Sequence, residues 1–260
     1  MITNQEGMIN RDEELTMIYG TRAVIEALRS GKEFERIFLQ QQLNNPLIRE
    51  LKEEMKKANA HFQLVPGDKL NRLTRSNHQG VIGYLSTIEY GHTEDLVPTV
   101  FESGKMPLLV MLDRITDTRN LGAIARTAAC TGVNALIIPS RGSAMINSDA
   151  VKTSAGALHQ LPVCREDNLK TTIDFLKSSG IKVVACSEKA ELDARDADLT
   201  GPLAIIMGSE ENGVSPEYMK RCDLTVKLPM VGNISSYNVS VAAGMVLYEV
   251  LCQRKKVKGS

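Results

Sequence analysis

The segment LLVMLDRITDTRNLGAIARTAAC, residues 108–130, contains the unit whose repetition decides the fold of this chain. Its first five residues are apolar and predict a buried strand, a polar loop follows, and Gly122 to Cys130 predicts a helix. The same alternation of strand and helix continues through the C-terminal half of the chain. Alternation of this kind is typical of an α/β domain built on a parallel sheet.

Outward from this segment, further apolar runs predict strands at residues 135–138, 161–164, 182–186, 203–207 and 224–228. Helices are predicted between them at residues 148–157, 168–177 and 216–221. A last helix has one apolar face, formed by Val239, Ala242, Ala243, Val246, Leu247 and Val250. These elements define a C-terminal domain at residues 107–254.

A smaller α/β unit precedes this domain, with strands predicted at residues 36–39, 62–65 and 81–85. We expect a polar leader at 1–15 and an N-terminal domain at 16–90. The stretch GHTEDLVPTVFESGKM has weak periodicity and is interrupted by glycine and proline, so it predicts a linker at 91–106. Residues 255–260 are expected to form a disordered basic tail.

Composition and charge exclude several classes of protein. A length of 260 residues suits two modest domains, and 43% hydrophobic with 24% charged residues argues against disorder. The net charge of +0 gives no bulk positive field, so any nucleic acid must be bound locally. Five scattered cysteines without a C-x-x-C pair predict a reducing, cytoplasmic environment. The polar start and the lack of a long apolar stretch predict neither export nor membrane insertion.

Candidate ligand loops follow three of the predicted strands, because ligands of open α/β sheets bind beyond the C-terminal strand ends. The loops read DRITDTRNLG after Leu112, GSEENG after Met207 and PMVGNISSYN after Leu228. None contains the dinucleotide fingerprint, and Val214 stands where a P-loop needs lysine. No H-E-x-x-H motif is present, so a zinc or other metal site is not expected. A cofactor without phosphates fits these loops better.

Three motifs in this order resemble the SpoU (TrmH-like) RNA 2′-O-methyltransferases of the SPOUT superfamily. They are NLGAIARTA at 120–128, GSEENG at 208–213 and LPMVGNISSYNVSVAAG at 228–244. The resemblance implies a SPOUT α/β fold with a deep trefoil knot, S-adenosylmethionine as cofactor, and a homodimer that completes the site across its interface. It also implies transfer of a methyl group to a ribose 2′-hydroxyl of RNA.

The N-terminal unit is similar to the L30e-like RNA-binding domain of family members that act on ribosomal RNA. The similarity rests on IYGTRAVIEAL near the start and on HQGVIGYL before the expected linker. It favours ribosomal RNA over tRNA, and the family members that the chain most resembles imply a guanosine of 23S rRNA as the target. A tRNA 2′-O-methyltransferase and a resistance-type rRNA methyltransferase stay open as alternatives, and so does a non-catalytic RNA-binding protein of ribosome assembly.

The resemblance implies five catalytic residues: Arg126, Asn120, Glu210, Ser236 and Asn238. Because guanidinium holds its proton above about pH 12, we expect Arg126 to grip the target phosphate and stabilise the developing 2′-alkoxide. Asn120 either caps the adjoining helix or positions the ribose. Glu210 either binds the substrate hydroxyl or orients Arg126.

The same resemblance implies a set of cofactor-binding residues: Gly208, Leu228, Met230, Gly232, Ser236, Tyr237, Asn238 and Val239. Ser236 and Asn238 also precede the last helix, where their side chains could satisfy its free amides. The family usually has leucine where this chain has Tyr237. An adenine pocket of altered shape is therefore an alternative.

Overall fold

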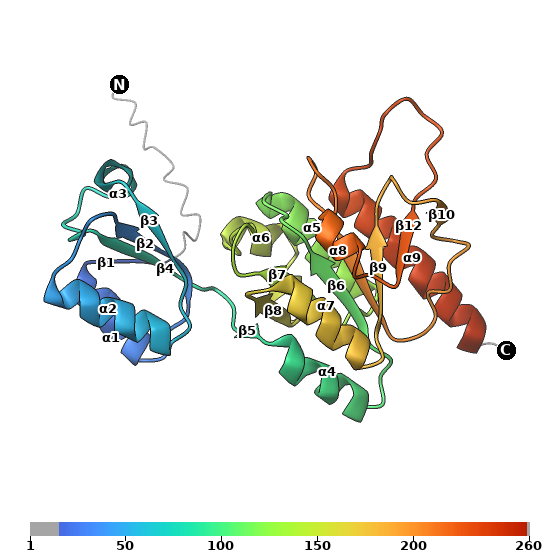
Figure 1. Ribbon diagram of the computed structural model, residues 1–260, viewed down its shortest axis with the longest axis horizontal. Helices are drawn as coiled ribbons and strands as arrows, with labels where there is room; N and C mark the ends of the chain where they lie inside the picture. The colour runs from blue at the N-terminus through green and yellow to red at the C-terminus, as the bar shows by residue number, and fades with distance from the viewer. Residues whose placement is uncertain (1–15, 259–260) are drawn as a thin grey trace, which may run out of the picture. The chain divides into compact units, whose positions relative to one another are not determined.

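The computed structural model describes residues 16–258, which form two compact units, and the division between them falls in the chain between Thr87 and Ile88 (Figure 1). The predicted polar leader, 1–15, lies outside the described residues. Within the part of the chain that is described, no helix is long and apolar enough to cross a membrane. No group of three or more His, Cys, Asp or Glu side chains in this part is placed to hold a metal ion.

The first unit is a small α/β domain around a four-stranded sheet in the order β1-β4-β2-β3. Its strands are β1 (Met17–Tyr19), β2 (Phe34–Gln40), β3 (Phe62–Val65) and β4 (Val81–Leu85). Its helices are α1 (Thr21–Arg29), α2 (Pro46–Lys57) and α3 (Gly67–Leu73). Helices α1 and α2 pack on one face of the sheet and α3 on the other. Successive buried residues of a strand point to opposite faces of the sheet, so each face has its own apolar cluster for the helices to cover.

The second unit is built on an eight-stranded sheet in the order β10-β12-β9-β11-β6-β7-β8-β5, with every pair of neighbours parallel. The central strands are β9 (Lys182–Cys186), β11 (Leu203–Met207) and β6 (Leu108–Leu112), followed by β7 (Ala135–Pro139) and β8 (Val163–Glu166). The remaining strands are β12 (Leu224–Lys227), β10 (Leu192–Asp193) and β5 (Tyr90–Gly91). The prediction of an α/β domain with a parallel sheet is confirmed.

Helices cover both faces of this sheet and form a three-layered domain (Figure 1). One face carries α5 (Thr118–Cys130), α6 (Ser148–Thr153), the 3-10 helix η1 (Ala157–His159) and α9 (Val239–Lys258). The other carries α4 (Thr93–Glu102), α7 (Leu169–Ser178) and α8 (Pro216–Met219). Along β6, alternate apolar residues enter the two cores, which explains why the strand is apolar throughout.

The expected linker at 91–106 is wrong, because this stretch contains helix α4 and belongs to the second unit. Pro98 lies inside the helix and removes one hydrogen bond, but Val97 and Val100 are buried and keep the segment helical. The weak periodicity of the sequence therefore hid a short helix that tertiary packing stabilises.

The expected disordered tail at 255–260 is also wrong for its first residues, since α9 continues to Lys258. The preceding residue Arg254 donates hydrogen bonds from Nη2 to the carbonyl oxygens of Pro107 (2.9 Å) and Gly201 (2.7 Å). These bonds hold the last turns of α9 against the sheet. Residues 259–260 lie outside the described part of the chain.

Gly122 allows helix α5 to pack against the backbone of α6. A Cβ at this position would lie 2.6 Å from the carbonyl oxygen of Ala150 and 2.7 Å from Cβ of Thr153. Real Cβ atoms do not approach other atoms this closely, so α5 and α6 would have to separate.

We expect Gly122→Ala to lower the free energy of unfolding by about 1–3 kcal/mol, because the close helix contact cannot absorb a methyl group. Gly244→Ala is the matched control, since its Cβ would first meet Thr127 at an ordinary 3.6 Å and alanine favours helix α9. Denaturant unfolding of both variants measures the difference. Equal midpoints for the two would contradict the role given to Gly122.

Candidate active site

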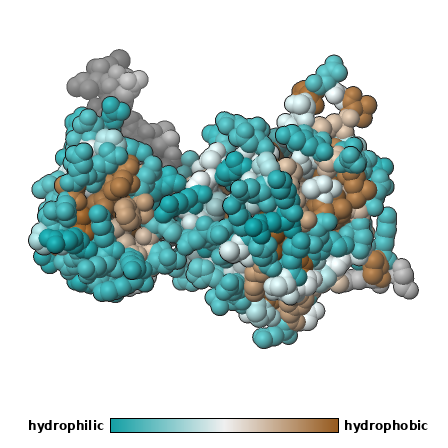
Figure 2. All heavy atoms as spheres, viewed as in Figure 1, coloured by the Kyte–Doolittle hydropathy of each residue, from teal (hydrophilic) through white to brown (hydrophobic). Residues whose placement is uncertain are grey.

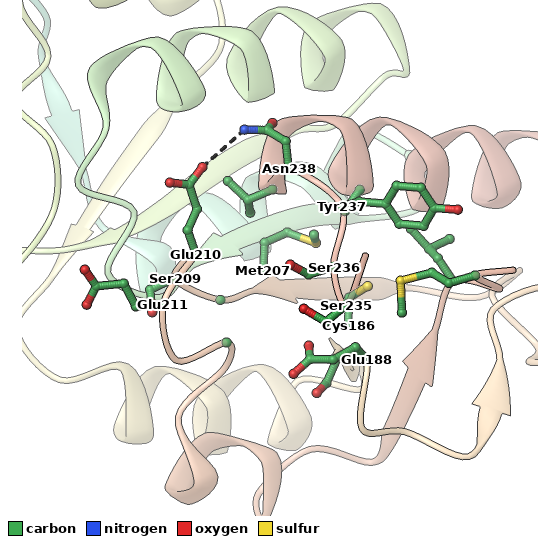
Figure 3. Close-up of a pocket in the computed structure, with 17 residues that line it drawn as sticks. Cys186, Glu188, Met207, Ser209, Glu210, Glu211, Ser235, Ser236, Tyr237 and Asn238 are labelled. Atoms are coloured by element: carbon green, nitrogen blue, oxygen red, sulfur yellow. Dashed lines mark hydrogen bonds between the residues drawn. The ribbon is translucent and has the colours of Figure 1, made fainter. Parts of the chain in front are cut away.

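A cavity of about 370 Å³ lies at the C-terminal ends of β9, β11 and β12 (Figure 3). The strand order brings the loops after these strands together at one edge of the sheet. The walls of this cavity are formed by Cys186, Ser187, Glu188, Met207, Gly208, Ser209, Glu210, Glu211, Gly213, Leu228, Met230, Ser235, Ser236, Tyr237, Asn238, Val239 and Ala242. The volume is that of a small-molecule site.

A second cavity of about 390 Å³ adjoins the first. The two cavities share Ser209, Glu210 and Glu211 in their walls. The rest of the second cavity is formed by Arg114, Ile115, Thr116, Asp117, Asn120 and Asn212. The loop after β11 therefore separates two spaces, and a ligand in each would approach the other at this loop.

Gly208 begins this loop at a position where only glycine fits. A Cβ there would lie 2.0 Å from the carbonyl carbon of Gly213 and 2.0 Å from the nitrogen of Val214. The loop folds back on itself, with backbone hydrogen bonds in both directions between Ser209 and Gly213 (3.2 and 2.8 Å). This close return of the backbone shapes one wall of the first cavity.

A hydrogen-bonded network joins one side chain from each of the three motif loops. Nδ2 of Asn120 donates to Oε1 of Glu210, which lies 90 residues further along the chain. Nδ2 of Asn238 donates to Oδ1 of Asn120 (3.1 Å) and to Oε1 of Glu210 (3.2 Å; Figure 3). The three polar side chains therefore hold each other at the boundary between the two cavities.

The hydrogen bonds at the starts of α5 and α9 show which of Asn120 and Asn238 caps a helix, a question that the sequence left open. Helix α5 begins at Thr118, earlier than predicted, and its cap is Asp117, whose carboxylate accepts from the backbone nitrogens of Arg119 (2.7 Å) and Asn120 (3.0 Å). The hypothesis that Asn120 caps this helix is wrong, and its side chain is free to join the network. Oδ1 of Asn238 does cap α9, accepting from the nitrogen (2.9 Å) and hydroxyl (2.6 Å) of Ser240.

The charged residues in the wall of the first cavity are the three carboxylates Glu188, Glu210 and Glu211, with no lysine or arginine among the described residues that line it. Such a wall favours a cationic ligand over a phosphate. Burial, followed by the charge of Glu188, raises the pKa of Cys186 to about 11. This thiol is therefore protonated near neutral pH and is a poor nucleophile.

Most of the residues that the sequence assigns to the site lie together. The first cavity is lined by Gly208, Glu210, Leu228, Met230, Ser236, Tyr237, Asn238 and Val239, and the second by Asn120 and Glu210. The hydroxyl of Tyr237 donates to the carbonyl oxygen of Pro229 (2.9 Å), which closes the loop between β12 and α9. Gly232 lies in the same loop but lines neither cavity.

Arg126 is the predicted site residue that the chain keeps apart from the others. It is exposed on α5 and lines neither cavity. The hypothesis that Glu210 orients Arg126 is not met within one chain, because the contacts of Glu210 are with the two asparagine amides.

Three wall residues that the sequence did not indicate lie at the end of strand β9: Cys186 is its last residue, and Ser187 and Glu188 follow it. The rule that ligands bind beyond strand ends applies equally to this strand, whose bounds were predicted correctly. The loop after β9 contains no glycine, whereas the other three loops do, so the sequence did not indicate it as a ligand loop. The second cavity also draws on Arg114, Ile115 and Thr116, to which the sequence gave no role.

Comparisons with known proteins identify the class to which this fold and site belong. The family described as SpoU rRNA Methylase matches residues 107–248, and the description "RNA 2′-O ribose methyltransferase substrate binding" matches residues 17–91. YacO of Bacillus subtilis, assigned to the TrmH family of tRNA/rRNA methyltransferases, is 35% identical over 240 residues, covering 92% of this chain and 96% of YacO. A Staphylococcus haemolyticus protein of the same assignment is 36% identical over 241 residues, 93% of this chain and 97% of its own length.

Solved structures agree with this assignment. The SpoU methyltransferase AviRb of Streptomyces viridochromogenes has a TM-score of 0.59 at 25% identity, covering 95% of this chain and 92% of AviRb. An AdoMet-bound rRNA methyltransferase of Sinorhizobium meliloti has a TM-score of 0.57 at 25% identity, with 90% and 85% covered. The chain belongs to the SpoU family of RNA methyltransferases, as the three motifs predict.

We expect Gly208→Ala to weaken S-adenosylmethionine binding at least about tenfold, because its Cβ would push Gly213 and Val214 into a new position and deform the cavity. Gly201→Ala is the control, since nothing lies within 4 Å of its Cβ position and Gly201 lies just before the start of β11, at the opposite end of this strand from the cavity. Isothermal titration calorimetry of the two variants measures both affinities. Wild-type affinity in Gly208→Ala would show that this wall does not contact the cofactor.

Proposed function

We propose that this chain transfers a methyl group to a ribose 2′-hydroxyl of RNA, with a guanosine of 23S rRNA as the target. The carrying observation is the network of Asn120, Glu210 and Asn238 at the boundary between two adjoining cavities. A methyl donor in one cavity and a ribose in the other would meet at this network. Methyl transfer depends mainly on such positioning, since it requires the reacting atoms to be held about 3 Å apart in line.

The cofactor is S-adenosylmethionine, which the S. meliloti relative holds. The first cavity fits it, because apolar walls at Leu228, Met230 and Val239 suit an adenine and the carboxylates suit a cation. The return of the backbone at Gly208 and Gly213 leaves main-chain groups at the surface of the cavity. Bound there, the cofactor supplies an electrophilic methyl group on a sulfonium.

We assign to Glu210 the role of holding the ribose hydroxyl. Its Oε1 accepts from Asn238 and Asn120, whereas its Oε2 accepts no hydrogen bond from the described residues. We assign to Oε2 a hydrogen bond from the 2′-hydroxyl. Ser236 lines the same cavity and is assigned a contact with the cofactor.

Arg126 is assigned the grip on the target phosphate and the stabilisation of the developing 2′-alkoxide. Because it lies outside both cavities of its own chain, we propose that a homodimer brings it to the site of the other copy. Support comes from three apolar side chains that are exposed on α9, those of Val241, Met245 and Tyr248. Hydrophobic surface, brown in Figure 2, also appears on the part of the second unit where Figure 1 draws α9 and the loop before it. Helix α5, which carries Arg126, packs beside α9, so both helices would meet the second copy.

Ribosomal RNA is preferred to tRNA as the substrate because of the N-terminal unit. This unit matches a substrate-binding family, and its mixed four-stranded sheet with helices on both faces is compatible with an L30e-like domain. We propose that it presents ribosomal RNA to the catalytic domain. The A. aeolicus tRNA modifying enzyme, by comparison, matches over only 59% of this chain.

Two further proposals concern the fold and its setting. We propose that the segment from β12 to α9 forms the trefoil knot of SPOUT proteins, and its return to Asn120 and Glu210 through Asn238 supports this threading. We also propose a cytoplasmic location. It is supported by five cysteines that are all free thiols.

The test offers labelled S-adenosylmethionine with undermodified 23S rRNA or with tRNA to the wild type and to Arg126→Ala. We expect label in 23S rRNA at a guanosine ribose, and a loss of at least about 100-fold in Arg126→Ala because the alkoxide loses its cation. Label in tRNA alone would show that the substrate is tRNA and not 23S rRNA. If the wild type labels neither RNA, the chain is a non-catalytic RNA-binding protein.

Mixing two variants of low activity tests whether Arg126 acts across the dimer. In a randomly mixed population of Arg126→Ala and Glu210→Gln, half of the dimers are mixed, and each of these rebuilds one complete site if the arginine crosses the interface. We therefore expect about a quarter of wild-type activity from the mixture. Activity no higher than that of either variant alone would place Arg126 in its own chain's site.

A further inference from the structure

Asp113 is a buried carboxylate with no place in either cavity. It follows β6 directly, its side chain is 1% exposed, and it lines neither space. Its Oδ1 accepts from Nε of Arg114 (2.7 Å), and its Oδ2 accepts from Nη2 of Arg114 (2.9 Å) and from the backbone nitrogen of Ser215 (2.7 Å). One side chain therefore ties the loop after β6 to the end of the loop after β11, 102 residues away.

Arg114 has an unusual backbone conformation that keeps it on this carboxylate. Its φ of 57° lies in the left-handed region, which arginine rarely adopts. Nη2 also donates to the carbonyl oxygen of Gly213 (3.4 Å), and the hydrogen bonds that Arg114 donates to Asp113 raise the pKa of Arg114 above its ordinary value. Strain of this kind persists only where surrounding contacts maintain it.

Val214 anchors the end of the loop after β11 in the hydrophobic core, and the other attachments of this loop are hydrogen bonds. Its base is closed by the paired backbone bonds of Ser209 and Gly213, and its tip carries the exposed residues Glu210, Glu211 and Asn212. The tip is held by the asparagine network, and the base is held to the neighbouring loop by Asp113 and Arg114. Movement of the base would carry Glu210 with it.

We infer that Asp113 and Arg114 form a clasp that positions Glu210 for methyl transfer. This inference rests on the proposed function, because it takes Glu210 as the group that holds the ribose hydroxyl. Asp113 lines neither cavity and acts through its partners, so it is a positioning residue, and Arg114, which also lines the second cavity, is the partner through which it acts. A carboxylate in this place does what a backbone contact alone cannot, since it accepts from two loops at once.

The activity test is a double-mutant cycle on the turnover number at saturating RNA and S-adenosylmethionine. We expect Asp113→Asn to lower kcat about tenfold or more, because asparagine cannot accept both bonds from Arg114. We expect the double variant Asp113→Asn/Glu210→Gln to lie within about twofold of Glu210→Gln alone. A double variant lowered by the product of the two single effects would overturn the inference, because Asp113 would then act independently of Glu210.

The matched control is Asp198→Asn, which removes the same charge from an ion pair with Lys182 (3.2 Å) at the opposite end of the sheet. We expect its kcat to equal that of the wild type. If Asp113→Asn does not fold, Arg114→Asn replaces it, because asparagine tolerates the left-handed conformation and Arg114 is 42% exposed. The same cycle with Glu210→Gln then decides.

Amide hydrogen exchange of the free protein tests the clasp without activity. We expect the amides of Gly213 and Ser215 to exchange at least about tenfold faster in Asp113→Asn, while those of β6 and β11 keep their protection. Unchanged exchange at both loop amides would overturn the clasp. If the wild type methylates no RNA, the proposed function fails, whereas this measurement still reports on the clasp by itself.

Discussion

The parallel pairing of β11 with β6 is the interaction on which the site depends. The two strands run in register from Leu203 opposite Leu108 to Met207 opposite Leu112, so their following loops begin side by side. The first residue past β6 agrees with this, since the nitrogen of Asp113 donates to the carbonyl oxygen of Met207, the last residue of β11 (2.8 Å). Glu210 and Asn120 meet only because of this register. A shift by one residue would exchange the two faces of β11 and separate the loops.

Asn238 connects this pair of loops to the rest of the domain. Its side-chain oxygen Oδ1 caps α9, and its side-chain nitrogen Nδ2 donates to Asn120 and Glu210. The start of a long helix is thus fixed to the candidate catalytic residues by one side chain. An apolar substitution would remove the cap and the network together, so stability and activity are coupled at this position.

Secondary structure was predictable where apolar runs are uninterrupted. The bounds of β6, β9 and β11 were predicted exactly as they occur, because strands buried on both faces are apolar throughout. Strands β1, β5 and β10 were not predicted, because a strand of two or three residues is too short to show a periodic pattern. Helix α4 escaped because Pro98 is a helix breaker on sequence grounds, and only the burial of Val97 and Val100 stabilises it.

The sequence by itself determined the α/β class, the three motif loops and the family, because these depend on local patterns and on residue identity. Tertiary structure alone decided which side chains meet. It gave the cap of α5 to Asp117 and freed Asn120, it brought Glu188 into the cavity, and it left Arg126 outside. It also buried Asp113 between two loops. The physical reason is strand order: β11 lies between β9 and β6, and a hydrophobic pattern specifies that a strand is buried but not which strands lie beside it.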